Sequence, residues 1–347
     1  MLRMTGQTAD RVRHLVTGWA ADAGEFVHDL AWSPDGNHLA VAAADGSVSV
    51  FGAGDGKLRW RADGHPLATT SVDWSPDGAL VASGGQDSTV RLWNAADGRA
   101  QAALACGSQW LEGLAWLSNG QLLTACGRAL RLWSADGTSL QAFATADSTV
   151  TGLDLLADDT FFSCCYGKVQ HWRADDPDAA REFPWKDSVL SVAASPDGRW
   201  VAAGCQDRSV HIWDRASGED LAMSGYGTKV RLLSWDHSGR YLATDGAHEA
   251  LIVWDCAGSG PSGREPLYLP AHMEKVSDLR FTHGDRRFAS GGEDGLVYIV
   301  GMDDRRPLFG LWDEAPVSKI AWSRNDSHLA VGYASGRISV SPVPVNA

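Results

Sequence analysis

The stretch "SPDGALVASGGQDSTVRLWNAADG", from Ser75 to Gly98, contains a turn tetrapeptide, a short apolar run, an Asp and a strand-like segment that ends in Trp93. Parts of the same pattern recur as "SPDGNHLAVAAADGSVSVF" from Ser33 and as "SPDGRWVAAGCQDRSVHIW" from Ser195. A pattern that recurs every roughly 20–50 residues is the signature of a repeat architecture. We therefore expect the chain to consist of copies of one structural unit.

The repeat period is measured on the residue just before each turn, which is Trp in "AWSPDG". The residues at this position are Trp32, Trp74, Trp116, Leu155, Ala194, Trp235, Phe281 and Trp322, at spacings of 42, 42, 39, 39, 41, 46 and 41. A period of roughly 40–45 residues is typical of four-stranded propeller blades. Alternating β-branched segments such as "STVRLW" and "RSVHIW" predict short strands between the turns. The sequence therefore predicts an all-β repeat protein.

Several of these repeats carry further residues that mark a known family. Trp213-Asp214 and Trp254-Asp255 end two strands, Trp93-Asn94 ends another, and Gly64-His65 opens the second repeat. On these residues the chain resembles the WD40-repeat family, and the segments "GYGTKVRLLSWDHSGRYLAT" and "IVWDCAGSGPSGREPLYLPAH" resemble stand-alone WD40 proteins of bacteria. The resemblance implies a β-propeller whose second repeat buries a hydrogen-bonded structural tetrad of His65, Ser83, Asp87 and Trp93.

The number of blades follows from counting strands. Seven units are each followed by a fourth strand, whereas the eighth runs out of chain after its third strand. An N-terminal strand at about 11–18 supplies the missing partner, which predicts eight four-stranded blades, with seven as the alternative. We expect one domain over 11–343, in which the first three strands of each blade span about 25–51, 67–93, 109–133, 148–172, 187–213, 228–254, 274–300 and 315–343.

Composition limits the classes of partner and compartment. Lys and Arg number 30 against 43 Asp and Glu, a net charge of −13, which argues against binding nucleic acid. The sequence has no apolar run of about 18 residues that would span a membrane, and its N-terminus lacks the apolar core of a signal peptide. Six cysteines without paired spacing suit a reducing compartment. We expect a monomeric cytoplasmic protein without a cofactor.

Function is sought in residues that depart from the repeat. In this family the loops before the first strand and the turns after the second strand of each blade open on one face, the top face. Aromatic and charged residues there are typical of protein interfaces. The predicted partner-binding residues are Trp110, Glu112, Trp185, Lys186, Tyr226, Lys229, Arg231, Lys275, Gln86, Gln206 and Glu293, with Glu274 and Trp312 in the same loops. The sequence therefore predicts a non-enzymatic scaffold that binds another protein.

Two other classes of function stay open. Cys126, Cys164, Cys165 and Cys205 end the second strands of three adjacent repeats, where they are weak candidates for a metal site. That site would make the chain a metal-binding or metal-homeostasis accessory protein, although no Cys-x-x-Cys spacing occurs. The last alternative is a propeller enzyme with a site in the central channel, but no catalytic motif stands out. "GSGPSG" at Gly258–Gly263 contains Pro261 and precedes no predicted helix, so it is a loop.

Overall fold

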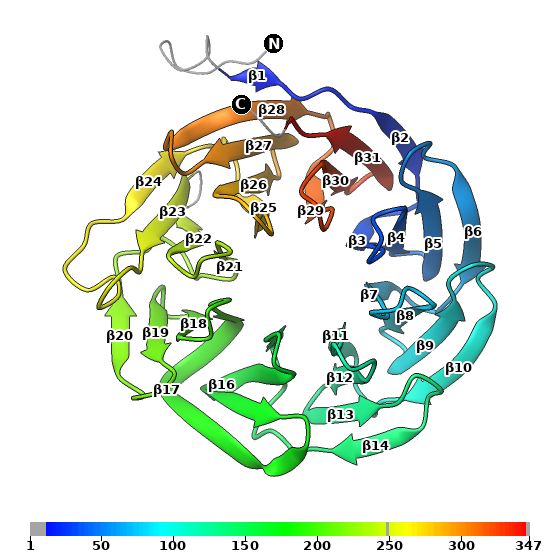
Figure 1. The fold of residues 1–347 in the computed structure, drawn as a ribbon, viewed down its shortest axis with the longest axis horizontal. Coiled ribbons are helices and arrows are strands. Elements are labelled where there is room, and N and C mark those ends of the chain that lie inside the picture. The colour runs from blue at the N-terminus through cyan, green and yellow to red at the C-terminus, as the bar shows by residue number, and fades with distance from the viewer. Residues whose placement is uncertain (1–11, 248–249, 345–347) are drawn as a thin grey trace.

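The computed structural model describes residues 12–247 and 250–344, with the side chains of 178–180 and 247 left out. Every element of regular structure in these residues is a β-strand. The strands form small sheets arranged radially in a ring, in which the first strand of each sheet lies nearest the axis and the last strand lies outside (Figure 1). No helix within the described ranges is long and apolar enough to cross a membrane. The fold is the all-β propeller expected from the repeat.

The first three blades are separate antiparallel sheets that follow chain order. Blade 1 contains β3 (Val27–Trp32), β4 (His38–Ala43), β5 (Ser47–Gly52) and β6 (Leu58–Asp63). Blade 2 contains β7 (Thr69–Trp74), β8 (Leu80–Gly85), β9 (Thr89–Asn94) and β10 (Ala100–Ala105). Blade 3 contains β11 (Leu111–Trp116), β12 (Leu122–Cys126), β13 (Ala129–Trp133) and β14 (Ser139–Ala142).

A six-stranded sheet comes next, and two of its strands are unusually long. Its strands are β15 (Gly152–Leu155), β16 (Thr160–Arg173), β17 (Asp176–Ala194), β18 (Trp200–Cys205), β19 (Val210–Asp214) and β20 (Asp220–Met223). The first half of β17 pairs with β16, as in Phe183 opposite Val169, and its second half pairs with β18. We interpret this sheet as blades 4 and 5 joined through β17. The count of eight blades depends on this interpretation and stays a prediction.

The last three blades complete the ring. Blade 6 contains β21 (Leu233–Trp235), β22 (Tyr241–Ala247), β23 (Ala250–Asp255) and β24 (Leu267–Pro270). Blade 7 contains β25 (Val276–Phe281), β26 (Arg287–Gly292), β27 (Leu296–Gly301) and β28 (Arg306–Trp312), with β1 (Arg13–His14) added outside. Blade 8 contains β29 (Val317–Trp322), β30 (His328–Tyr333), β31 (Arg337–Pro342) and, as its outer strand, β2 (Trp19–Asp22).

An N-terminal strand does close the ring, but it lies later in the chain than predicted. Trp19 pairs antiparallel with Val340, so β2 and not the segment at about 11–18 completes blade 8. Residues 13 and 14 instead pair in parallel with β28 of blade 7. Trp19 also links blade 8 to blade 1, because its indole N–H donates to the Ala53 carbonyl at 2.6 Å and its ring packs where Gly56 leaves space. Arg11, the predicted start of the domain, lies outside the described residues.

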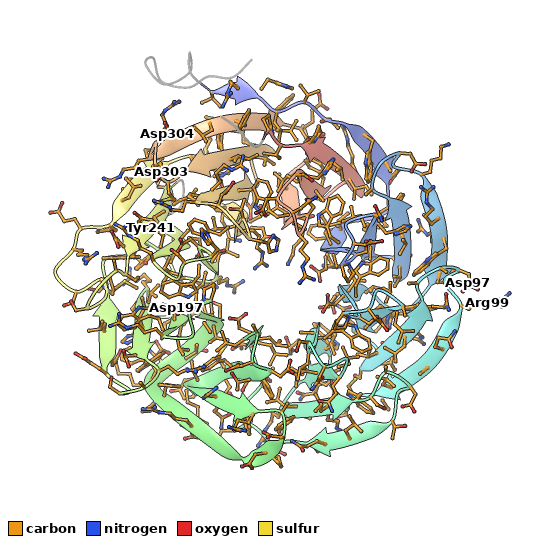
Figure 2. The ribbon with its side chains drawn as sticks, in the orientation of Figure 1. Asp97, Arg99, Asp197, Tyr241, Asp303 and Asp304 are labelled. Atoms are coloured by element: carbon orange, nitrogen blue, oxygen red, sulfur yellow. The ribbon has the colours of Figure 1, made fainter. Side chains whose placement is uncertain are left out.

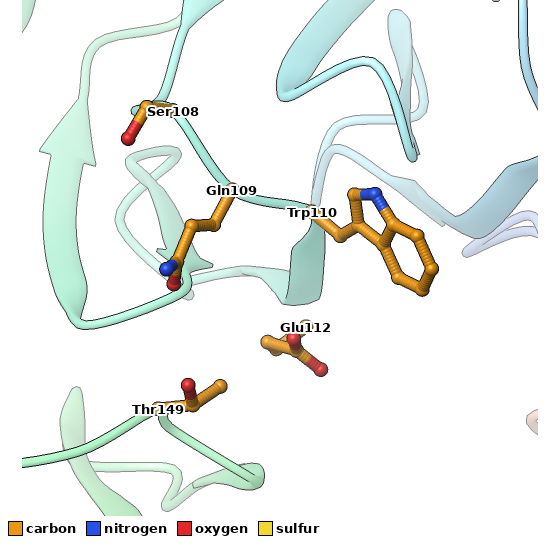
Figure 3. A pocket seen from close by; sticks show the side chains of 5 residues that line it. All are labelled: Ser108, Gln109, Trp110, Glu112 and Thr149. Carbon is orange, nitrogen blue, oxygen red and sulfur yellow. The ribbon is translucent and has the colours of Figure 1, made fainter.

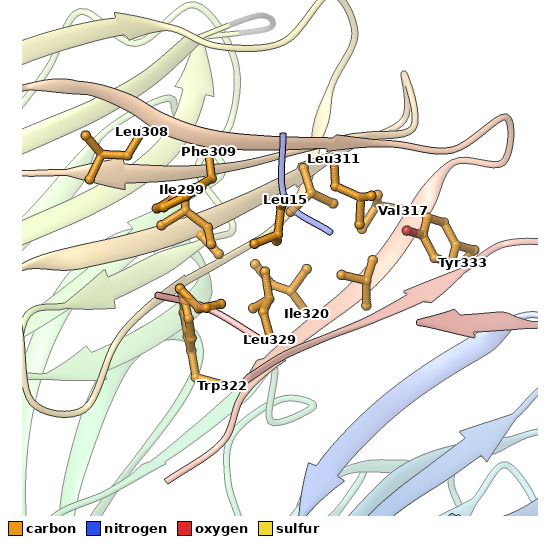
Figure 4. Close-up of a cluster of buried hydrophobic side chains, with 14 residues drawn as sticks. Leu15, Ile299, Leu308, Phe309, Leu311, Val317, Ile320, Trp322, Leu329 and Tyr333 are labelled. Atoms are coloured by element: carbon orange, nitrogen blue, oxygen red, sulfur yellow. The ribbon is translucent and has the colours of Figure 1, made fainter. Parts of the chain in front are cut away.

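The hydrophobic core lies between the blades. Each buried apolar cluster combines strands from two neighbouring blades. Between blades 7 and 8, for example, Ile299 and Phe309 face Ile320 and Leu329, and Leu15 from the N-terminal segment is buried among them (Figure 4). A seam of this kind is stabilised mainly by removing apolar surface from water. Because these clusters are formed mainly by residues of the strands, the loops at the top and bottom of the ring contribute little to the core.

Candidate functional site at the top face

A repeated hydrogen bond defines equivalent positions on the top face. The N–H at the end of the second strand of a blade donates to the carbonyl of the residue near the start of its first strand. In blades 1, 2, 3, 5, 7 and 8 these donor and acceptor pairs are Ala44–Phe26, Gln86–Ala68, Gly127–Trp110, Gln206–Ser188, Glu293–Lys275 and Ala334–Pro316. The predicted residues Gln206 and Glu293 have exposed side chains at these positions, and Gln86 is half-buried.

Exposed apolar side chains lie on the top loops of four blades, and we call this set the apolar arc. Its members are Met273 and Trp312 of blade 7, Phe26 of blade 1, Leu67 of blade 2 and Trp110 of blade 3. Trp110 is 59% exposed and Trp312 is 53% exposed, although large indoles are usually covered. Exposed indoles are the kind of side chain that is enriched at protein interfaces.

Cations gather on another part of the same face, and we call this set the basic arc. Its members are Lys186 and Arg208 of blade 5, Lys229 and Arg231 of blade 6, and Lys275 of blade 7. Lys275 lies 3.4 Å from the Glu293 carboxylate, whereas the other four form no ion pair within the described part of the chain. Uncompensated cations on a protein of net charge −13 create a local positive potential that attracts acidic groups.

The segment that carries Arg231 is held by a buried carboxylate. Asp245 accepts the backbone N–H groups of Arg231 at 2.8 Å and of Leu232 at 2.9 Å. Burial raises the pKa of Asp245, although these hydrogen bonds favour the ionised form. Asp245 therefore fixes the backbone from which the exposed Arg231 side chain extends. The sequence analysis did not identify this residue, because nothing in the repeat pattern marks it.

Two of the predicted partner-binding residues are packed inside the protein or against it. Tyr226 is 5% exposed, and its hydroxyl accepts the indole N–H of Trp254 at 2.7 Å and lies 3.1 Å from the Thr244 hydroxyl. Tyr226 is therefore a core residue and not part of the binding surface. Trp185 is half-buried, and its ring centroid lies 3.5 Å from that of His211. Lys186 remains exposed, with its ammonium 5.3 Å from the Trp185 ring.

The structural tetrad of blade 2 is hydrogen-bonded throughout. His65 lies 2.9 Å from Asp87 through Nδ1 and 2.9 Å from the Ser83 hydroxyl through Nε2, and the Trp93 indole donates to the same hydroxyl at 2.8 Å. Burial opposes ionisation of Asp87, but hydrogen bonds from Thr89, His65 and Arg91 outweigh it and lower its pKa to about 2. The tetrad therefore links the loop before blade 2 with β8 and β9 through buried polar groups.

The four cysteines proposed as weak metal ligands do not converge. Cys126 lies in the seam between blades 2 and 3, Cys165 in the next seam, and Cys164 and Cys205 in the seam between blades 4 and 5. All four are buried. Among residues 12–247 and 250–344, no three His, Cys, Asp or Glu side chains are grouped so as to hold a metal ion. These cysteines are small core residues of their seams.

An open pocket lies beside Trp110, between blades 3 and 4. It is lined by Ser108, Gln109, Trp110, Glu112 and Thr149 and holds ≈ 330 Å³ (Figure 3). Glu112 reaches it because the pairing of β11 with β12 skips a residue between Leu111 and Gly113. A bulge of this kind turns the extra side chain out of the ladder. Of the predicted residues, Trp110 and Glu112 are thus brought together, whereas Arg231 lies on blade 6.

Comparisons with known proteins agree with this architecture. The family model described as "WD domain, G-beta repeat" matches residues 56–94, 181–214 and 263–300, and that of the "Anaphase-promoting complex subunit 4 WD40 domain" matches 11–66. A computationally designed protein, Ika8, superimposes with a TM-score of 0.79 at 20% identity, covering 95% of this chain and all of its own.

Natural relatives match over part of the chain. "Protein FIZZY-RELATED 3" of Arabidopsis thaliana is 27% identical over 145 residues, 41% of this chain and 29% of its own length. "Cell division cycle 20.1, cofactor of APC complex" of the same plant is 30% identical over 118 residues, 33% of this chain and 24% of its own length. The matched region thus spans less than a third of either relative. The resemblance to bacterial stand-alone proteins stays a prediction.

Proposed function

This chain is a WD40-repeat protein, and we propose that it is a non-enzymatic scaffold that binds another protein through its top face. The observation that carries the proposal is the meeting of the apolar arc with the basic arc on one rim. A partner segment with acidic and apolar side chains would satisfy both, because the cations attract its carboxylates and the exposed indoles cover its apolar groups. Aromatic and Arg side chains are also the residues that dominate binding energy at interfaces.

The names of the relatives support a protein partner. One is described as a cofactor of the APC complex, and one matching family model belongs to a subunit of that complex. From these relatives we infer for this chain only that it associates with another protein, and we do not infer which one. The proposal includes a monomer in the cytoplasm; six free, buried cysteines support a reducing compartment.

The test is capture of partners from the native host by immobilised protein, followed by mass spectrometry and measurement of affinity. Replacing both Trp110 and Arg231 with Ala should lower the affinity for the captured partner about tenfold or more, roughly 1.4 kcal/mol of binding free energy. The melting temperature of the variant should be nearly unchanged. The matched control replaces an exposed aromatic and an exposed cation away from the top face, Tyr268→Ala on β24 and Arg99→Ala at the outer edge of the ring (Figure 2). Loss of the partner in the control but not in the top-face variant would contradict the proposal.

A further inference from the structure

We propose that the pocket beside Trp110 is a subsite for a cationic side chain, Lys or Arg, of the partner protein; this inference rests on the proposed function. The pocket is open to solvent at the rim and is large enough for the end of one long side chain. Its five lining residues combine one aromatic ring, one carboxylate, one amide and two hydroxyls. The aromatic ring and the carboxylate are the two groups that determine which side chain can bind there.

The aromatic wall favours a cation. Trp110 is 59% exposed, and within the described chain no cation is recorded over its ring. Among aromatic rings, indole attracts ammonium and guanidinium groups most strongly, because its face carries negative charge. The Trp110 backbone is fixed, since its carbonyl accepts the N–H of Gly127. The ring is therefore presented from a rigid position.

The carboxylate in the pocket has the complementary charge. Glu112 forms no ion pair in the part of the chain that the structure describes, and partial burial alone raises its pKa. A guanidinium or ammonium group that entered beside Trp110 would give this carboxylate charge-assisted hydrogen bonds. Figure 3 shows the Trp110 ring and the Glu112 carboxylate on one side of the pocket, with Ser108, Gln109 and Thr149 on the other. One entering cation can therefore contact both.

Other occupants fit the pocket less well. No Lys or Arg lines it, so an anion would meet only the like charge of Glu112. An apolar side chain would remove that carboxylate from water without replacing its hydrogen bonds, which costs free energy. A sugar could stack on Trp110 and bond to Gln109, but it would leave the negative charge uncompensated. The test below includes it as an outcome.

The subsite would also set the direction in which a partner segment binds. Blades 6 and 7, which carry Lys229, Arg231 and Lys275, lie across the ring axis from blade 3 (Figure 1). A segment that crosses the top face would place its cation beside Glu112 and its acidic residues near Arg231. The reversed segment would bring like charges together at both ends, and such contacts are strongly unfavourable.

The experiment uses small probes and therefore needs no partner. The full chain is labelled with 5-fluorotryptophan, and the Trp110 fluorine signal is identified from its loss in Trp110→Phe. N-acetyl-L-arginine N-methylamide is titrated, with the norleucine analogue and methyl glucoside as neutral probes. The arginine probe should shift the Trp110 signal, and Glu112→Gln should weaken its binding about tenfold. Glu274→Gln, an exposed top-face carboxylate outside the pocket, should leave binding unchanged.

Three results would overturn the inference: no shift with the arginine probe, an equal shift with norleucine or the glucoside, or full binding in Glu112→Gln. A melting curve of each variant shows whether it is folded. The proposed function fails on a different result, which is retention of the partner by the variant lacking Trp110 and Arg231. The two failures are therefore distinguishable.

Discussion

Blades 2 and 4 show how far one repeat can diverge while the ring stays closed. Blade 2 keeps the tetrad, and the Trp74 indole at the end of β7 donates to the Ala31 carbonyl of blade 1 at 3.0 Å. Blade 4 has Leu155 where blade 2 has Trp74, and of the tetrad it keeps only the bond from the Trp172 indole to the Ser163 hydroxyl, at 2.9 Å. Most polar links that define the repeat are therefore missing from blade 4.

Aromatic packing takes their place. The ring of Phe143 from blade 3 meets those of Phe161 and Trp172 of blade 4 edge-on, with centroids 5.1 Å and 5.5 Å apart. Phe161 and Trp172 are also stacked, at 6.2 Å. Edge-on and offset aromatic pairs stabilise cores beyond the area they bury. The interior of a blade can therefore be polar or aromatic, provided that it is filled.

One link is common to both blades, and it joins each to the next. The Asp73 carboxylate of blade 2 accepts the backbone N–H of Trp116 in blade 3 at 3.0 Å. The Asp154 carboxylate of blade 4 accepts the N–H of Ala194 in blade 5 at 2.7 Å. A polar link between innermost strands thus survives where the blade interior has changed, which indicates that closure near the axis is the stricter requirement.

The largest effect is expected from emptying the aromatic cluster of blade 4. Phe161 is fully buried, so Phe161→Ala should lower the free energy of unfolding by about 3–5 kcal/mol. Urea unfolding followed by circular dichroism measures the change. Tyr166→Ala removes an exposed aromatic side chain of the same blade and should cost under about 0.5 kcal/mol. Equal losses in the two variants would mean that the cluster does not replace the missing polar links.

A smaller effect is expected from breaking the tetrad of blade 2. Asp87→Ala would leave the buried His65 ring without its acceptor and should cost about 1–3 kcal/mol at pH 7. Because the folded pKa of Asp87 is lowered to about 2, the stability that it contributes is present above its unfolded pKa and is lost as the pH falls toward 2. The control Asp35→Ala, in a solvent-facing turn, should cost well under 1 kcal/mol. Equal urea midpoints for the two variants would contradict a buried tetrad.

The smallest effect is expected from Asp73 of blade 2 and Asp154 of blade 4, which make the link common to both blades. It is a dependence of folding stability on pH. Burial raises the folded pKa of Asp73 and of Asp154 to about 6, so the folded chain holds these protons more tightly than the unfolded chain. Their contribution to stability therefore falls as the pH rises from about 4 to 6. Melting temperatures of Asp73→Asn and Asp154→Asn, relative to the parent, should rise between about pH 4 and 6. A constant difference over that range would show that these groups do not titrate as described.

The repeat pattern predicted the propeller fold because period, turns and strand alternation all report the same unit. The sequence also marks the strand that closes the ring, because "WAADAG" from Trp19 resembles "WRADGH" from Trp60. In the structure each of these two indoles packs against a glycine in a turn of the next blade, Gly56 for Trp19 and Gly98 for Trp60. The prediction of 11–18 overlooked that match. A merged sheet such as the one through β17 could not be predicted, because strand continuity depends on tertiary pairing.

The binding face was harder to predict than the fold. Residue type alone placed Tyr226 on the surface, whereas only the packing shows its hydroxyl buried beside Trp254. Conversely, the sequence analysis did not identify Phe26, Leu67 and Met273, although they are exposed and lie in the loops of blades 1, 2 and 7 that correspond to the Trp110 loop of blade 3. Comparing equivalent positions around the ring would have identified them. The bulge that turns Glu112 outward recurs at the equivalent position of blades 1, 2, 5, 7 and 8, so its position belongs to the repeat, but the strand alternation by itself does not show it.

The pairing of Trp19 with Val340 has a consequence for how the chain is made. A ribosome releases β2 first, and its partner β31 follows only after all the strands between them in the chain. Until then β2 has no neighbour in blade 8, and contacts between such distant segments form slowly because a long loop must close. The growing chain must therefore carry an unpaired strand while the rest of the ring is synthesised, and exposed strand edges of this kind favour aggregation of folding intermediates.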